Sequence, residues 1–162
     1  MKMKAKRFVS AAAAILLGLS LLTGCSQNNG KTITAATDEV AQSLQESLSF
    51  EYELSKLSDD AANRLYSLDG NILEEQAVYV GVGGALADEV SVWRVKDEKD
   101  AATVKEAAEK RVENQKASFE NYVPEEMPKL ENAVITVDGD TVILCVSSDS
   151  DKAKEVIASF EE

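Results

Sequence analysis

The residue types that most enzymes use for acid, base or nucleophile chemistry are scarce in this chain. Its 162 residues include no histidine, so it can build neither a Ser-His-Asp triad nor a Cys-His pair, and it offers no imidazole metal ligand. It does carry 29 aspartates and glutamates, and a pair of carboxylates can act as general acid and base in a hydrolase. Abundance alone does not indicate such a pair. The other reactive groups are two cysteines.

The first cysteine, Cys25, lies in a context typical of covalent lipid attachment. Four cations and no acid occupy residues 1–7, an apolar run follows over residues 8–22, and residues 22–25 read Leu-Thr-Gly-Cys. This order resembles the signal peptide and lipobox of a bacterial lipoprotein, which implies that the Cys25 thiol is joined to diacylglycerol and that the chain is cut before it. The apolar run is shorter than the roughly 20 residues of a membrane-spanning helix. An ordinary secreted or membrane-anchored protein with an accidental cysteine is the alternative.

The lipobox predicts where the protein resides and how it touches the membrane. We expect a signal peptide over residues 1–24, a lipidated cysteine and flexible tether over residues 25–36, and a lipid anchor at the extracytoplasmic face of the cell membrane. Loss of the leader makes the net charge of −12 more negative by four units. A domain this acidic repels phosphate backbones and anionic lipids, so we expect no nucleic-acid partner and membrane contact through the lipid on Cys25 alone.

The remainder of the chain, residues 37–162, predicts a single α+β domain. Helices are expected to begin at Thr37, at the Ser58 cap, at residue 97 and near Ser148 or Asp149. Strands are expected over residues 77–82, 89–95, 133–137 and 141–146. Two hairpins with helices between and after them favour a two-layer sandwich, in which a four-stranded, mainly antiparallel sheet has its helices packed on one face.

The second hairpin carries the clearest local signal. Asp138 and Gly139 separate its two strands, and Asp-Gly is typical of a type I′ turn, which needs positive φ at both central residues. With the turn centred there, Ile135 faces Val142. The remaining thiol, Cys145, lies in the second strand of this hairpin, where we expect it to be buried.

Two polar residues interrupt the apolar face of the long helix expected over residues 97–121. Arg111 and Gln115 fall within the arc formed by its apolar side chains. A guanidinium there is costly unless it reaches water or finds a carboxylate, and we expect Glu89 or Asp88 to pair with it. Alternatively, Asp88 and Glu89 line a pocket in which Arg111 and Gln115 hold an anionic or amide-bearing ligand, because a guanidinium offers a planar fork of donors.

The other motifs favour structural explanations, and we expect no cofactor and no metal. Residues 81–84 read Gly-Val-Gly-Gly, but the third glycine of a dinucleotide-binding loop is missing. Residues 138–140 and 149–151 each hold two aspartates, yet neither segment reaches the spacing of a calcium loop. A hairpin bend, a turn and a helix cap explain these segments.

Several stretches occur in an order that resembles a known but uncharacterised family. They comprise residues 87–97, 111–115, 119–124 and 132–147, together with Leu65-Tyr66 and the lipobox. In this order they resemble the small bacterial lipoproteins of domain-of-unknown-function family 4358. The resemblance implies no activity.

Two functions from different classes are consistent with these features. The first is a non-catalytic lipoprotein whose domain binds an envelope protein or a small ligand, which the missing nucleophile–base pairs favour. The second is a small carboxylate-dependent hydrolase of cell-envelope polymers, which would need a cleft with two convergent acids.

Overall fold

The computed structural model describes residues 32–83 and 85–161, which form one α+β domain. Its α-helices are α1 (Thr37–Ser47), α2 (Asp59–Tyr66), α3 (Ala101–Phe119), α4 (Met127–Glu131) and α5 (Ser150–Ala158). Its strands are β1 (Ser55–Lys56), β2 (Leu73–Val80), β3 (Glu89–Val95), β4 (Val134–Asp138) and β5 (Thr141–Val146). Short 3-10 helices cover Gly70–Ile72, Glu98–Asp100 and Pro124–Glu126.

The expected leader, residues 1–24, lies outside the described residues, as do Cys25 and the first part of the expected tether. None of the helices that are described is both long and apolar enough to cross a membrane.

The sheet has five strands in the described residues, one more than predicted. All neighbours are antiparallel, in the order β1-β2-β3-β5-β4. The additional strand, β1, contains two residues, both exposed, and pairs with the end of β2. A strand of two exposed residues has no alternating apolar pattern, so the sequence offered no signal for it.

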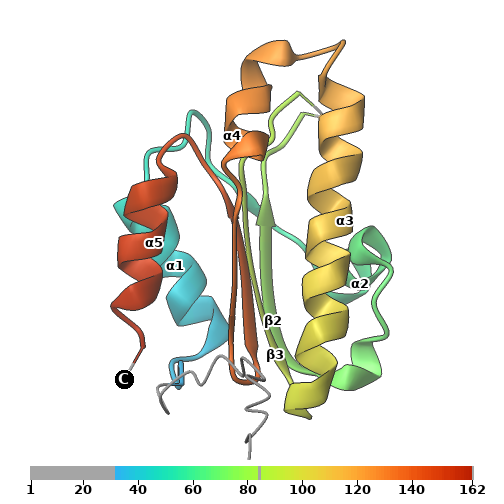
Figure 1. Ribbon diagram of the computed structural model, residues 1–162, viewed down its shortest axis with the longest axis vertical. Coiled ribbons are helices and arrows are strands. Elements are labelled where there is room, and N and C mark those ends of the chain that lie inside the picture. Colours follow the sequence, from blue (N-terminus) through green and yellow to red (C-terminus); the bar gives the residue numbers. More distant parts are fainter. Residues whose placement is uncertain (1–31, 84, 162) are drawn as a thin grey trace, which may run out of the picture.

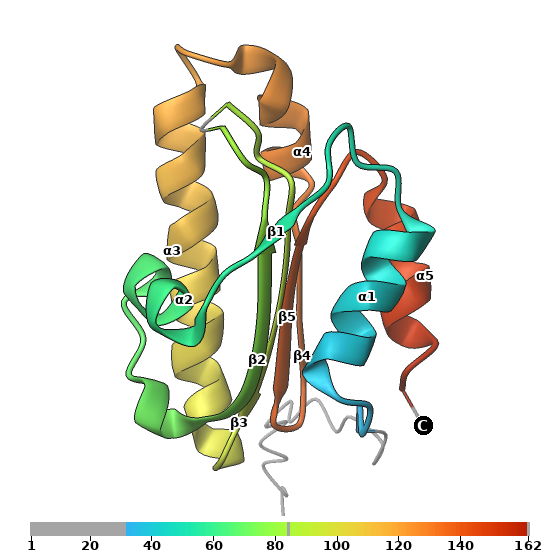
Figure 2. The ribbon, with the colours of Figure 1, turned by 180° about the vertical axis from the view of Figure 1, so that it is seen from behind.

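Helices cover both faces of the sheet, which corrects the expected packing on one face. α1 and α5 lie on one face, and α2, α3 and α4 lie on the other (Figure 1; Figure 2). Neighbouring residues of β5 enter separate cores: Leu144 packs beneath α3, and Ile143 packs beneath α1 and α5. Every residue of β5 is buried, and the run Val-Ile-Leu-Cys-Val is typical of a strand covered on both sides. The domain therefore has three layers.

The predicted N-terminal caps of α2 and α5 are confirmed. Ser58 Oγ accepts a hydrogen bond from a backbone N–H in the first turn of α2, and Asp149 does the same for α5. Thr37 is not a cap, because α1 has no side-chain cap of its own. Instead, the Thr37 N–H donates to Glu75 Oε2 of β2 at 3.2 Å, so the sheet satisfies the start of this helix.

The turn of the β4–β5 hairpin is centred one residue later than predicted. Asp138 pairs with Thr141, so Gly139 and Asp140 form the loop. Gly139 has a φ of +56°, whereas Asp140 does not have a positive φ. This is the φ pattern of a type II′ turn, which places glycine first, rather than of type I′.

The shifted centre changes the cross-strand partners but not the faces. Ile135 lies opposite Leu144 instead of Val142, a displacement of two residues. Because side chains alternate along a strand, an even displacement leaves each of them on its predicted side of the sheet.

Candidate functional site

Arg111 and Glu89 form an ion pair that joins α3 to β3. Arg111 Nε and Nη2 both donate to Glu89 Oε2, at 3.2 and 3.1 Å. The Glu89 side chain is fully buried, whereas 22% of the Arg111 side chain is exposed. Of the two carboxylates predicted as partners of Arg111, Glu89 is therefore the one that pairs with it.

A chain of hydroxyl groups holds the other oxygen of Glu89. Ser91 Oγ donates to Glu89 Oε1 at 3.0 Å, and the hydroxyls of Ser91 and Tyr66 lie 3.1 Å apart. Burial raises the pKa of Glu89, while Arg111 and Ser91 act in the opposite direction. A buried carboxylate is tolerated only with such partners, so these contacts fix α2 and α3 against β3.

Asp88 belongs to a separate cluster near the end of the β2–β3 connection. Lys129 Nζ of α4 donates to Asp88 Oδ2 at 2.9 Å and to Glu126 Oε2 at 3.0 Å. Glu126 Oε2 also accepts the Ala87 N–H at 2.7 Å. Burial raises the pKa of Asp88, and Lys129 opposes the rise. Two acids converge here on a shared lysine, and Asp88 does not accompany Arg111.

Arg111 and Gln115 line a groove of about 620 Å³ between α2, α3 and the β2–β3 connection. The apolar part of its wall comes from Leu57, Ala61, Leu65, Val80, Leu86 and Phe119. The polar part adds Arg64, Asn114 and Ser118. The volume lies within the range of small-molecule sites, which are mainly apolar with a few placed polar groups.

The charge of this groove differs from that of the surrounding surface. Two arginines line it, and no carboxylate does. Three other hollows in the described part of the chain are each lined by at least two acids. The lining of this groove is therefore cationic, unlike that of the three other hollows, although Glu89 behind the wall offsets the charge of Arg111.

Gln115 has an unsatisfied group in the wall of the groove. Its side chain amide lies one helical turn beyond Arg111, and the residue is 6% exposed. Gln115 Oε1 is buried and has no hydrogen-bond partner among the described residues. Buried polar atoms are nearly always satisfied in folded proteins, so this oxygen lacks a donor. Because the oxygen is enclosed, a ligand in the groove reaches it only when the side-chain amide turns outward.

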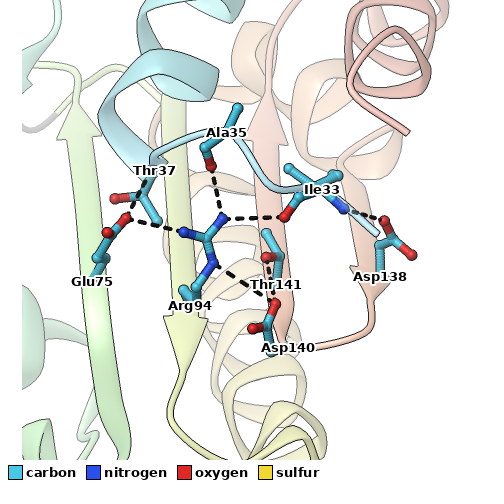
Figure 3. Close-up of polar contacts among 8 residues, drawn as sticks. All are labelled: Ile33, Ala35, Thr37, Glu75, Arg94, Asp138, Asp140 and Thr141. Carbon is cyan, nitrogen blue, oxygen red and sulfur yellow. Dashed lines mark hydrogen bonds and ion pairs between the residues drawn. The ribbon is translucent and has the colours of Figure 1, made fainter. Parts of the chain in front are cut away.

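A second arginine cluster lies at the other end of β3 and was not predicted from the sequence (Figure 3). Arg94 Nη2 donates to the carbonyl oxygens of Ile33 and Ala35, at 3.1 and 2.7 Å. Its Nη1 donates to Glu75 Oε2 at 3.3 Å, and its Nε lies 3.8 Å from Asp140 Oδ1. The guanidinium of Arg94 on β3 thus joins β2, the β4–β5 turn and the segment that precedes α1.

That segment, residues 32–36, is docked against the sheet, and we call it the stem. Ile33 is buried, and its N–H donates to Asp138 Oδ2 at 2.9 Å. Thr32 lies beside the β4–β5 turn, because a Cβ on Gly139 would be 3.3 Å from Thr32 Cγ2. The stem was expected to form the last part of a flexible tether over residues 25–36, but it is part of the folded domain. The sequence feature that could have indicated the docked stem is Arg94 itself, because a cation in a largely apolar strand needs polar partners.

Cys145 is buried and free, as predicted, and burial raises the pKa of its thiol to about 12. Within the described ranges, no group of three or more Cys, Asp or Glu side chains is placed to hold a metal ion.

Together, the fold and the site define a three-layer α+β domain with an antiparallel sheet and an arginine-lined groove on one side. Residues 46–147 match the family described as domain of unknown function DUF4358, and the chain belongs to this family. The match includes the whole sheet, the groove and the Glu89 and Arg94 positions, but not the stem. No curated protein and no solved structure shows a significant match to the chain.

Proposed function

We propose that this protein is a membrane-anchored, extracytoplasmic lipoprotein whose domain binds a small anionic ligand, without catalysis, in the groove between α2 and α3. One observation carries the proposal: Arg64 and Arg111 line the groove, and no carboxylate does. An acidic protein that gathers two cations at one concave, largely apolar site favours anions there and disfavours cations.

Arg111 retains donors for a ligand although it is paired. Glu89 engages its Nε and Nη2, whereas Nη1 makes no hydrogen bond to any described residue. A guanidinium binds carboxylates through its planar fork of N–H groups. In this proposal the ion pair and a ligand role for Arg111 and Gln115 coexist, because Glu89 engages Nε and Nη2 and leaves Nη1 for a ligand. Asp88 and Glu89, which were expected to line the pocket, are not part of the groove lining.

The anchor at Cys25 rests on the lipobox, and the docked stem supports a role for it. Residues 26–31 separate Cys25 from Thr32, where the described fold begins. Even fully extended, this length of chain spans no more than roughly 25 Å. A lipid on Cys25 would hold the stem, and the adjoining β4–β5 turn, close to the bilayer.

Replacement of Cys25 tests the anchor. Cys25→Ser should abolish lipidation, because serine offers no thiolate for diacylglycerol transfer. The wild type should enter the detergent phase with the mass of a cut, lipidated chain, and the variant should keep the mass of the uncut chain. Cys145→Ser is the matched control and should be processed like the wild type. If Cys25→Ser and the wild type share the mass of the uncut, lipid-free chain, the lipobox interpretation is wrong.

Calorimetric titration with small carboxylates tests the groove. We expect 4-methylpentanoate or N-acetyl-leucine to bind saturably to the protein purified in detergent. Arg64→Gln should weaken this binding about threefold, the size expected for an exposed ion pair. Lys110→Gln removes the same charge from an exposed position of α3 outside the groove and should change little. Absence of binding, or equal weakening by both substitutions, would count against an anion site in the groove.

A further inference from the structure

The wall of the groove contains two different hydrogen-bonding groups, one helical turn apart on α3. Arg111 offers donors, and Gln115, one turn further along α3, offers a buried acceptor that no described residue satisfies. A simple carboxylate supplies acceptors only, so it would satisfy the guanidinium and leave the Gln115 oxygen without a partner. A complementary ligand must therefore carry a donor close to its anionic group.

The charge of the groove restricts the kind of donor. A free amino acid has a donor beside its carboxylate, but that donor is an ammonium ion. Arg64 and Arg111 repel a cation, and the groove has no carboxylate to receive one. An acylated amino group keeps an N–H beside the carboxylate and carries no charge. This chemistry fits both Arg111 and Gln115.

The rest of the wall indicates an apolar side chain on the ligand. Leu57, Leu65 and Phe119 contribute apolar surface, and Leu65 is one of the large apolar residues that remain exposed. Covering this surface is favourable in proportion to the area removed from water.

We infer that the groove binds an N-acylated amino acid with a free carboxylate and an apolar side chain, with the carboxylate on Arg111 and Arg64. The amide N–H is received by Gln115 Oε1 after the Gln115 amide turns from its enclosed position toward the groove. The C-terminal residue of a peptide and a free N-acyl amino acid share this chemistry. The inference rests on the proposed anion site and goes further, because it adds the requirement for an adjacent amide N–H.

Four ligands that differ by one group test the inference by calorimetry on the purified protein. N-acetyl-leucine has every required group. 4-Methylpentanoate lacks the acylated amine, N-acetyl-leucinamide lacks the carboxylate, and leucine carries an ammonium ion instead of the amide. We expect each of the last three to bind at least about tenfold more weakly, because a site built around a hydrogen bond rejects an analogue that lacks it. N-acetyl-Ala-Ala-Leu distinguishes the sources: tighter binding than N-acetyl-leucine identifies a peptide end, and weaker binding a free acid.

A substitution at Gln115 links the discrimination to this residue. Gln115→Leu should bind N-acetyl-leucine and 4-methylpentanoate with equal affinity, whereas Gln45→Leu on α1, outside the groove, should keep the wild-type preference. The comparison of ligands on the wild type needs no variant and stands even if Gln115→Leu folds poorly.

The outcomes separate this inference from the proposed function. If 4-methylpentanoate binds as tightly as N-acetyl-leucine, the groove is an anion site without the amide requirement, and the inference is wrong while the proposed function holds. If N-acetyl-leucinamide binds as tightly as N-acetyl-leucine, the carboxylate is not recognised and both are wrong. If none of the carboxylates binds, the proposed function fails as well.

Discussion

The two ends of β3 each carry an arginine-centred cluster, and the clusters differ in what they leave unsatisfied. At the Glu89 end the carboxylate is fully buried, and the cation, Arg111, lies partly exposed in a groove. At the Arg94 end the positions are reversed, because the cation is 13% exposed and its partners Glu75 and Asp140 reach the surface.

The two clusters also differ in how completely their buried atoms are paired. The Arg94 cluster joins the stem to the sheet and leaves none of its buried side-chain atoms without a partner in the described structure (Figure 3). Beside Arg111, the buried oxygen of Gln115 has none. Among the described residues, Gln76 Oε1, Trp93 Nε1 and Ser147 Oγ are also buried without a partner, but Gln115 is the one of these four residues that lines the groove. This difference is visible in the hydrogen bonds of the two regions and not in their numbers of charged residues.

The largest effect is expected when the Glu89 cluster loses its cation. Arg111→Met should lower the free energy of unfolding by about 3–5 kcal/mol, because it leaves a fully buried carboxylate without its counter-charge. Chemical denaturation at neutral pH measures this loss.

The matched control removes the charge of the partner as well. Adding Glu89→Gln to Arg111→Met should recover part of the lost stability, since an amide is cheaper to bury than an isolated carboxylate. If Arg111→Met leaves the denaturation midpoint unchanged, the guanidinium does not stabilise the buried Glu89 carboxylate. The contrast between a buried anion at one end of β3 and a buried cation at the other is then wrong.

A smaller effect is expected at the Arg94 end, where geometry matters more than charge. Arg94→Lys keeps the cation but has one nitrogen in place of the three that contact the stem carbonyls, Glu75 and Asp140, and it should cost about 2 kcal/mol. Faster hydrogen exchange of the Ile33 N–H should accompany this loss as the stem opens. Unchanged exchange at Ile33 would show that the stem is held without Arg94.

Elements with a strong local pattern were predictable from the sequence, and elements defined by distant partners were not. The long helix, the last helix and both hairpins follow apolar periodicity and capping. β1 exists because the end of β2 offers a free edge, and α1 begins where Glu75 receives its first N–H. The second helical layer has one sequence feature, the continuous apolar run of β5, because β3 carries Glu89, Ser91 and Arg94 among its apolar residues and does not have the pattern of a strand covered on both faces.

The same distinction between local patterns and distant partners applies to the residues of the candidate site. Arg111 and Gln115 were detectable because they break the periodicity of a single helix, and the Glu89 pairing followed from the cost of a lone buried charge. The groove could not be predicted, because its wall combines α2, α3 and the β2–β3 connection. The stem was missed because Ile33 is a single apolar residue within a polar segment, which gives no period.

The turn beside the stem should show a still smaller effect. Gly139→Val should lower the free energy of unfolding by at least about 1 kcal/mol, because a β-branched residue is strained at a φ of +56°. Gly139→Asn adds the same Cβ beside Thr32 but tolerates this backbone region, so it should lose less. Equal denaturation midpoints for Gly139→Val and the wild type would contradict the assigned turn. Equal losses in both variants would assign the effect to the stem contact instead.

The smallest expected effect is on the pH dependence of the free energy of unfolding. It tests whether Glu89 is charged in its pair with Arg111. Burial raises the pKa of Glu89, so the folded protein binds this proton more tightly than the unfolded chain does. The contribution of Glu89 to the free energy of unfolding should therefore rise as pH falls from neutrality through the folded pKa, and become constant below an unfolded pKa of about 4.3. Glu89→Gln lacks this contribution.

The measured quantity is the difference in unfolding free energy between the wild type and Glu89→Gln at a series of pH values, in which the other titrating groups cancel. We expect this difference to favour the wild type increasingly between pH 7 and about pH 4. Glu106→Gln, at an exposed position of α3, controls for a lost carboxylate on the surface. A difference that falls on acidification would mean that Arg111 outweighs burial and holds Glu89 charged. The guanidinium would then be committed to Glu89, as Arg94 is committed to the stem, and Arg64 would have to supply most of the charge that attracts an anion.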